Sequence, residues 1–226
     1  MFRKAGVMAF AMIAVAVSGC SDGKQASKKN FAGAIERWIS ENKDKAALCL
    51  GLDSGRERGS QDALVLDQQS SDDKKALDAM DVLAANGLLR REEKTEKSWF
   101  EVRRLAMFTP TEKGRALILS RTKNQPGLGE FTVRSLCVGR LELVNVENYT
   151  EPADSNGLRV SHVHASFRYA DLPAWVKDAR VMAYWPDAKR AAAGDFKQTV
   201  TMVLTGNGWL QAEQRGLGLE PFGAED

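Results

Sequence analysis

The sequence predicts an α+β fold with a helix-rich first half and a second half built from an antiparallel β-sheet with one or two helices. Two patterns predict this division. Residues 31–121 carry apolar side chains at helical spacing and residues typical of helix ends, whereas residues 130–214 contain Val- and Leu-rich or alternating segments typical of strands. With 226 residues, of which 43% are hydrophobic, the chain is large and apolar enough to fold around a packed core.

The N-terminal segment differs in composition from the rest of the chain. Arg3 and Lys4 form a basic start, and Ala5–Val17 is an apolar run that is too short to cross a bilayer as a helix. This order is typical of a secretory signal peptide, here residues 1–19. The segment ends in Val17-Ser18-Gly19-Cys20, which resembles the lipobox of bacterial lipoproteins. The alternative is an ordinary signal peptide, cleaved nearby, that leaves the cysteine unmodified.

The lipoprotein resemblance implies where the mature protein resides. It implies cleavage before Cys20 and acyl chains on that cysteine, palmitate among them, which hold the protein on a membrane without a transmembrane helix. The residue after the cysteine is Ser21 rather than Asp, which in this family permits sorting to the outer membrane, facing the periplasm. Removal of Arg3 and Lys4 lowers the 32 basic residues to 30, which equals the number of acidic residues. A neutral mature chain has no general attraction for nucleic acid.

A polar tether precedes the first predicted helix. Residues 21–30 hold no hydrophobic side chain larger than alanine, so residues 20–30 are predicted to be the lipidated cysteine and a solvated tether. A helix is predicted to follow and to end near Asn42, because four apolar residues share one helical face: Phe31, Ile35, Trp38 and Ile39. The apolar run 46–52 is predicted to be a strand or a buried segment.

The two cysteines outside the lipobox are predicted to form a disulfide. Cys49 and Cys137 are the only thiols left once Cys20 is acylated, and a lone pair in an exported protein is most economically a disulfide. Closing the loop between them would contribute about 4 to 5 kcal/mol in the chain-entropy model. Two separately buried free thiols are the alternative.

Two further helices and a hairpin are predicted between residues 70 and 121. Ser70 and Asp73 are spaced as a capping box, and Asn86-Gly87 is a natural helix end. Residues 88–91 and 99–108 are extended candidates separated by a charged turn. Thr109-Pro110-Thr111-Glu112 then combines capping residues with a proline in the first turn, so a helix is predicted to run to about Arg121.

Residues 72–120 resemble the core of winged helix domains. The resemblance rests on the order helix, basic hairpin, helix and on the turn residues Ala85-Asn86-Gly87 and Phe108-Thr109-Pro110. It implies a winged-helix-like subdomain over residues 31–121, whose hairpin would contact nucleic acid. Acidic residues alternate with the basic ones of the hairpin, and export would separate the protein from nucleic acid. We therefore expect no nucleic acid partner, and a solvated mixed-charge hairpin or a contact patch for a protein, glycan or lipid headgroup.

The second half is predicted to form a sheet subdomain over residues 130–214, followed by a flexible tail, 215–226. Residues 131–149 are rich in Val and Leu, and a slip in their apolar phase between Leu143 and Val144 predicts a bulge or burial on both faces. Leu158–Tyr169 alternates cleanly between apolar and polar residues. One or two short helices are expected in residues 171–193. A hairpin is expected around Gly206-Asn207-Gly208.

Few residues have the chemistry of a catalytic or metal site. His162 and His164 lie on one side of a predicted strand and would supply two metal ligands if a third donor joined them; a solvated strand face is the alternative. Ser166 shares that face, but the sequence contains no catalytic or phosphate-binding motif. Aromatic residues of the second half could line a ligand groove or pack in the core: Trp175, Tyr184, Trp185 and Trp209. No catalytic residue and no cofactor is therefore assigned.

These features favour a membrane-anchored envelope lipoprotein that acts as a non-enzymatic binding module for an envelope protein, a glycan or a small ligand. Two other functions stay open. One is a periplasm-facing hydrolase or metal-dependent enzyme that uses His162 and His164. The other is an immunity lipoprotein that neutralises a toxin, for which no residue speaks specifically.

Overall fold

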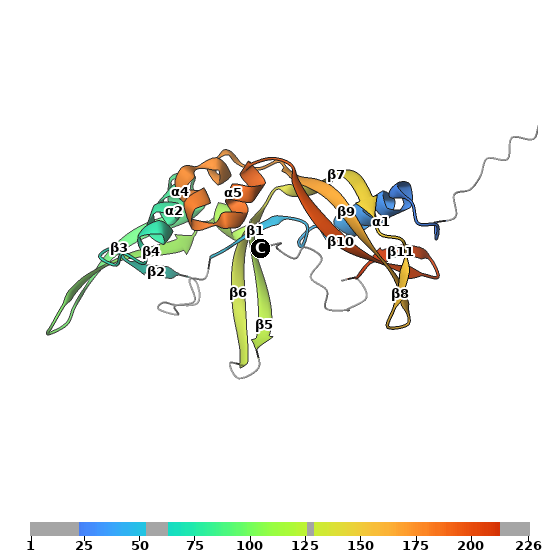
Figure 1. Cartoon of the computed structure of the whole chain (residues 1–226). Helices are drawn as coiled ribbons and strands as arrows, with labels where there is room; N and C mark the ends of the chain where they lie inside the picture. The colour runs from blue at the N-terminus through green and yellow to red at the C-terminus, as the bar shows by residue number, and fades with distance from the viewer. Residues whose placement is uncertain (1–22, 53–62, 126–128, 213–226) are drawn as a thin grey trace, which may run out of the picture.

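The computed structural model describes residues 23–52, 63–125 and 129–212 (Figure 1). The signal peptide, Cys20 and the tail 215–226 lie outside these ranges, so the predictions made for them are not tested by the structure. Of the residues in these ranges, 28% are helix and 47% are strand. In the described ranges the strands form three antiparallel sheets, which follow one another along an elongated molecule (Figure 1). No helix in these ranges has both the length and the hydropathy needed to cross a bilayer.

A three-stranded sheet with helices on it occupies one end of the molecule. Its strands are ordered β2 (Leu64–Asp67), β4 (Val102–Pro110) and β3 (Leu89–Lys97). The helices of this end are α2 (Lys74–Ala85), α4 (Ala179–Tyr184) and α5 (Pro186–Ala192), with the 3₁₀ turn η1 (Ala174–Lys177). They share one hydrophobic core, to which Met80 and Leu83 of α2 and Val181 of α4 contribute fully buried side chains.

A second three-stranded sheet lies in the middle and contains the disulfide. Its order is β1 (Leu48–Gly51), β6 (Gly129–Val138) and β5 (Ile118–Gln125), and the β5–β6 hairpin projects away from the helices (Figure 1). Cys49 and Cys137 are directly paired residues of β1 and β6, with Cα atoms 4.0 Å apart. The predicted disulfide is confirmed, and it joins the first half of the chain to the second.

A five-stranded sheet covered by α1 (Lys28–Glu41) forms the other end. The sheet runs β11 (Gly208–Gln211), β10 (Phe196–Thr205), β9 (Leu158–Ala170) and β7 (Arg140–Tyr149), and β8 (Ala153–Ser155) pairs with β9. The apolar face of α1 packs on the sheet through fully buried side chains such as Phe31 and Ile35. Phe31 also contacts Tyr149 and Trp209, with ring centroids 4.9 and 4.8 Å away.

The two cores do not divide the chain at a single point in the sequence. Helix α1, at the start, completes the core of the last sheet, and residues 174–191 return to pack against α2 and β1. Trp185 illustrates this return, since its indole N–H donates to the carbonyl oxygen of Gly51 at 2.9 Å.

The predicted fold class, a helix-rich and winged-helix-like first half followed by a sheet, is wrong. Strands dominate the protein, and the helix expected to reach Arg121 is α3 (Glu112–Arg115), a single turn capped by Thr111. Residues 118–125 instead form β5, because pairing with β6 satisfies their backbone groups in a ladder. Gly114 ends up buried beneath the Leu88 carbonyl, which leaves no room for a Cβ.

The charged segment expected to be a turn is also a strand. Residues 92–97 continue β3, and β3 pairs with β4 without interruption from Leu89 opposite Pro110 to Lys97 opposite Val102. The turn itself is therefore much shorter than predicted. Residues 72–120 have no third long helix, and a paired hairpin replaces the expected loop. They therefore do not have the arrangement of winged helix domains.

Several local predictions are confirmed, and one, the capping box of the second helix, is wrong. Helices α1 and α2 lie where periodicity placed them, and β9 buries Val163 and Phe167 on one face while exposing the histidines on the other. The predicted capping box is absent, because the Asp73 carboxylate accepts a hydrogen bond from the Asp67 N–H at 2.9 Å rather than capping its own helix. The apolar phase slip is a real irregularity: the β7–β9 register shifts between Leu143 and Asn145.

Candidate functional site

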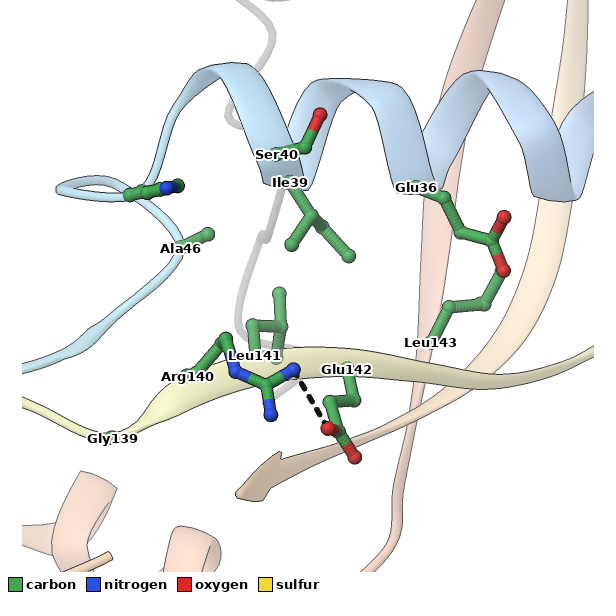
Figure 2. A pocket seen from close by; sticks show the side chains of 10 residues that line it. Glu36, Ile39, Ser40, Ala46, Gly139, Arg140, Leu141, Glu142 and Leu143 are labelled. Carbon is green, nitrogen blue, oxygen red and sulfur yellow. Dashed lines mark ion pairs between the residues drawn. The ribbon is translucent and has the colours of Figure 1, made fainter. Parts of the chain in front are cut away.

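A groove lies between α1 and β7 in the part of the chain that the structure describes (Figure 2). Its volume is about 570 Å³, which falls within the range of ligand-binding pockets. The helix contributes Glu36, Ile39 and Ser40, and the strand contributes residues 139–143. The groove therefore combines segments that are about a hundred residues apart in the sequence.

The floor of the groove is apolar. Leu141 is buried beneath it, and Ile39 and Leu143 are half-buried and point into the space between helix and strand (Figure 2). Ala46 closes one end, where its carbonyl oxygen accepts a hydrogen bond from the Leu141 N–H at 2.8 Å. A ligand that covers these partly exposed apolar side chains removes them from water, which favours binding.

Charged side chains lie along the mouth. Glu142 forms ion pairs with Arg140 at 2.8 Å and with Arg168 at 3.0 Å, and Arg140 also reaches Asp171 at 3.3 Å. The hydrogen bond from Arg168 is the main cause that lowers the pKa of Glu142 below 4.5. This carboxylate is therefore ionised, and compensated, at neutral pH.

A smaller cavity extends the groove toward the start of α1. It has a volume of about 270 Å³ and shares Glu36 and Leu143 with the larger one. Lys28 and Lys29 line its helix side, and residues 143–146 line its strand side. The two cavities lie next to each other along α1, from Lys28 to Lys43 just beyond the end of the helix, and we call them together the α1–β7 groove.

Strand β7 presents an open edge to this groove. It is the last strand in its sheet in the described ranges and pairs only with β9. Because the Leu141 N–H points away from β9, toward Ala46, the alternation of an antiparallel ladder turns the backbone groups of Leu143 to the same side. The register shift then leaves Val144 outside the ladder and 42% exposed. An unpaired strand edge of this kind is a template for pairing with another chain.

The histidine pair lies on the opposite face of the same sheet from α1. His162 and His164 are exposed, and each hydrogen-bonds a threonine of β10: Nδ1 of His162 lies 3.2 Å from Thr201, and Nδ1 of His164 lies 2.9 Å from Thr199. In the described residues no group of three or more His, Cys, Asp or Glu side chains is arranged to hold a metal. Within the described ranges no third donor joins the pair, so His162 and His164 have the surroundings of a solvated strand face.

The aromatic residues proposed as a ligand groove belong to two different cores. Trp175 and Trp185 pack with α2 and β1, whereas Trp209 packs against Phe31 of α1. They do not meet in one cavity. The sequence analysis did not predict the α1–β7 groove. Two signals pointed to it: the change of apolar phase beside Leu143, and the polar residues Glu36 and Ser40 on the side of α1 that is not buried in the core.

Comparison of the chain with protein-family models, with curated proteins and with solved structures gave no match.

Proposed function

We propose that this protein is a lipid-anchored, non-enzymatic envelope protein that binds an extended polypeptide segment of another envelope protein in the α1–β7 groove. One observation carries the proposal: an open strand edge lies beside an apolar groove walled by a helix. In β-strand addition, main-chain hydrogen bonds to such an edge provide affinity and pockets for alternate side chains provide specificity.

The length of the groove favours a peptide over a compact small ligand. Helix α1, Lys28–Glu41, extends about 20 Å at a rise of about 1.5 Å per residue. An extended segment of about six residues has the same length. Half of its side chains would face Ile39 and Leu143, and the other half would face solvent.

The charge of the groove favours an acidic segment. Lys28, Lys29 and Lys43 line the helix side, where Glu36 is the single acidic residue. On the strand side the acidic Glu142 is already neutralised by two arginines. The excess of positive charge would steer an acidic peptide to the groove and fix its register.

The proposed anchor would hold the groove close to the membrane. The chain is tied to the sheet soon after Cys20, because the carbonyl oxygens of Lys24 and Ala26 accept hydrogen bonds from Trp209 and Tyr149, both at 3.2 Å. Residues 20–23 span at most about 14 Å when extended. An acylated Cys20 would therefore place the start of α1, where the groove begins, next to the lipid surface.

The test is a peptide-display selection against the mature chain, followed by affinity measurement on the selected peptides. Leu143→Arg places a charged side chain in the apolar floor and should weaken binding at least about tenfold, a loss of about 1.4 kcal/mol. Val102→Arg is the matched control, because it makes a similar change at a 51% exposed position of β4 outside the groove. Selected peptides that bind Leu143→Arg as well as the unmodified chain would contradict the proposal.

A further inference from the structure

Leu89 is buried at the base of the β3–β4 hairpin, whereas every residue of β3 from Arg90 to Lys97 is exposed. Strand β4 contributes Ala106 and Phe108 to the core, so only the outer part of the hairpin, residues 95–104, extends beyond the core as a solvated stalk. This stalk leaves the end of the molecule that is farthest from α1 (Figure 1). Its three paired positions carry the tip about 10 Å beyond the core. The stalk buries no hydrophobic side chain, so its tip is the part that needs an explanation.

The tip carries two almost fully exposed aromatic residues. Trp99 is 96% and Phe100 94% exposed, and their rings stack with centroids 6.5 Å apart. They form the loop between Ser98 and Glu101, whose backbone groups are joined by a hydrogen bond of 2.9 Å. Short hairpin loops favour Gly, Asn and Asp, so turn geometry does not account for two aromatic residues there. Their large apolar surface is available to an outside partner.

The charge that is not compensated near the tip is positive. Glu96 pairs with Lys94 at 2.9 Å and Glu101 pairs with Arg103 at 3.2 Å. Lys97 lies opposite Val102 in the hairpin and, in the described ranges, forms no ion pair. Aromatic rings accompanied by basic side chains have the composition of protein segments that enter the interface of anionic bilayers.

We propose that the tip of the β3–β4 hairpin, Trp99 and Phe100, inserts into the interfacial layer of an anionic phospholipid bilayer as a second membrane contact. The inference rests on the proposed function in one respect, since the acyl anchor keeps a bilayer within reach. The anchor would act at the α1 end and the hairpin at the opposite end, so the molecule would lie along the membrane surface (Figure 1). This orientation would restrict how a partner approaches the α1–β7 groove.

Tryptophan fluorescence provides a direct measurement. The chain has five tryptophans, and the other four are at most 8% exposed, so a quencher in the acyl chains reports on Trp99. We expect vesicles of phosphatidylglycerol and phosphatidylethanolamine with brominated acyl chains to quench this emission and shift it to shorter wavelength. Phe100→Ser keeps the reporter and should lower the vesicle partition coefficient of the Cys20→Ser chain about tenfold or more.

Met182→Ser, at a partly exposed apolar position of α4 outside the α1–β7 groove, is the control and should partition as the unmodified chain does. Unchanged Trp99 emission in excess lipid, or equal partition of Phe100→Ser and Met182→Ser, overturns the inference. So does protection of Trp99 by solubilised envelope proteins but not by vesicles, which would assign the tip to a protein. Mass spectrometry of the mature chain reports acylation of Cys20 separately, so failure of the anchor is distinguishable from failure of the tip.

Discussion

Truncation of Phe31 tests the unexpected packing of α1 on the sheet of the second half. Its side chain is 0% exposed and lies against Tyr149 of β7 and Trp209 of β11. Phe→Ala substitutions in cores cost about 3 to 5 kcal/mol, which includes the lost aromatic pairs. Because Phe31 joins two strands at opposite edges of the sheet, we expect Phe31→Ala to lower the free energy of unfolding by about 4 kcal/mol.

Urea denaturation followed by circular dichroism measures this loss. Phe100→Ala is the matched control, since the same change at a residue that is 94% exposed should alter the free energy of unfolding by less than about 0.5 kcal/mol. A cost below about 1 kcal/mol for Phe31→Ala would mean that α1 is not an integral part of that core, and the geometry of the α1–β7 groove would lose its support.

Three further predictions concern the rest of the fold. Replacing Cys49 and Cys137 by alanine should lower the free energy of unfolding by about 4 to 5 kcal/mol, and a reductant should destabilise the unmodified chain but not the double variant. Gly114→Ala should cost about 1 to 3 kcal/mol in thermal unfolding because its Cβ would overlap a backbone carbonyl, whereas Gly33→Ala, at an open position of α1, should be neutral or stabilising. Burial raises the pKa of the Tyr169 hydroxyl above 10.0. The contribution of the neutral hydroxyl to stability is therefore complete below pH 10.0 and is lost as the pH rises through the raised pKa. Tyr169→Phe should lack this alkaline decline in the free energy of unfolding.

Short-range pattern was a good guide wherever one face of a single element decided the outcome. The spacing of Phe31, Ile35 and Trp38 placed α1, and the alternation of β9 identified its buried face. The phase slip beside Leu143 marked the bulge correctly, because a change of apolar phase in a strand has few other structural causes.

Prediction failed where distant partners competed with local preference. Thr111 caps a helix as expected, yet the helix ends at Arg115, and residues 118–125 pair with β6 instead. The charged residues 92–97 look like a loop by composition but lie in a ladder with β4, where oppositely charged neighbours such as Lys94 and Glu96 form ion pairs on the solvated surface.

From its residues alone the chain specified which cysteines pair, which faces of α1 and β9 are buried, and where β7 is irregular. The α1–β7 groove was beyond that information, because Glu36 and Leu143 meet only after α1 crosses to a sheet formed more than a hundred residues later. Periodicity states that a face is apolar, but the choice among several apolar partners depends on how all of them pack together.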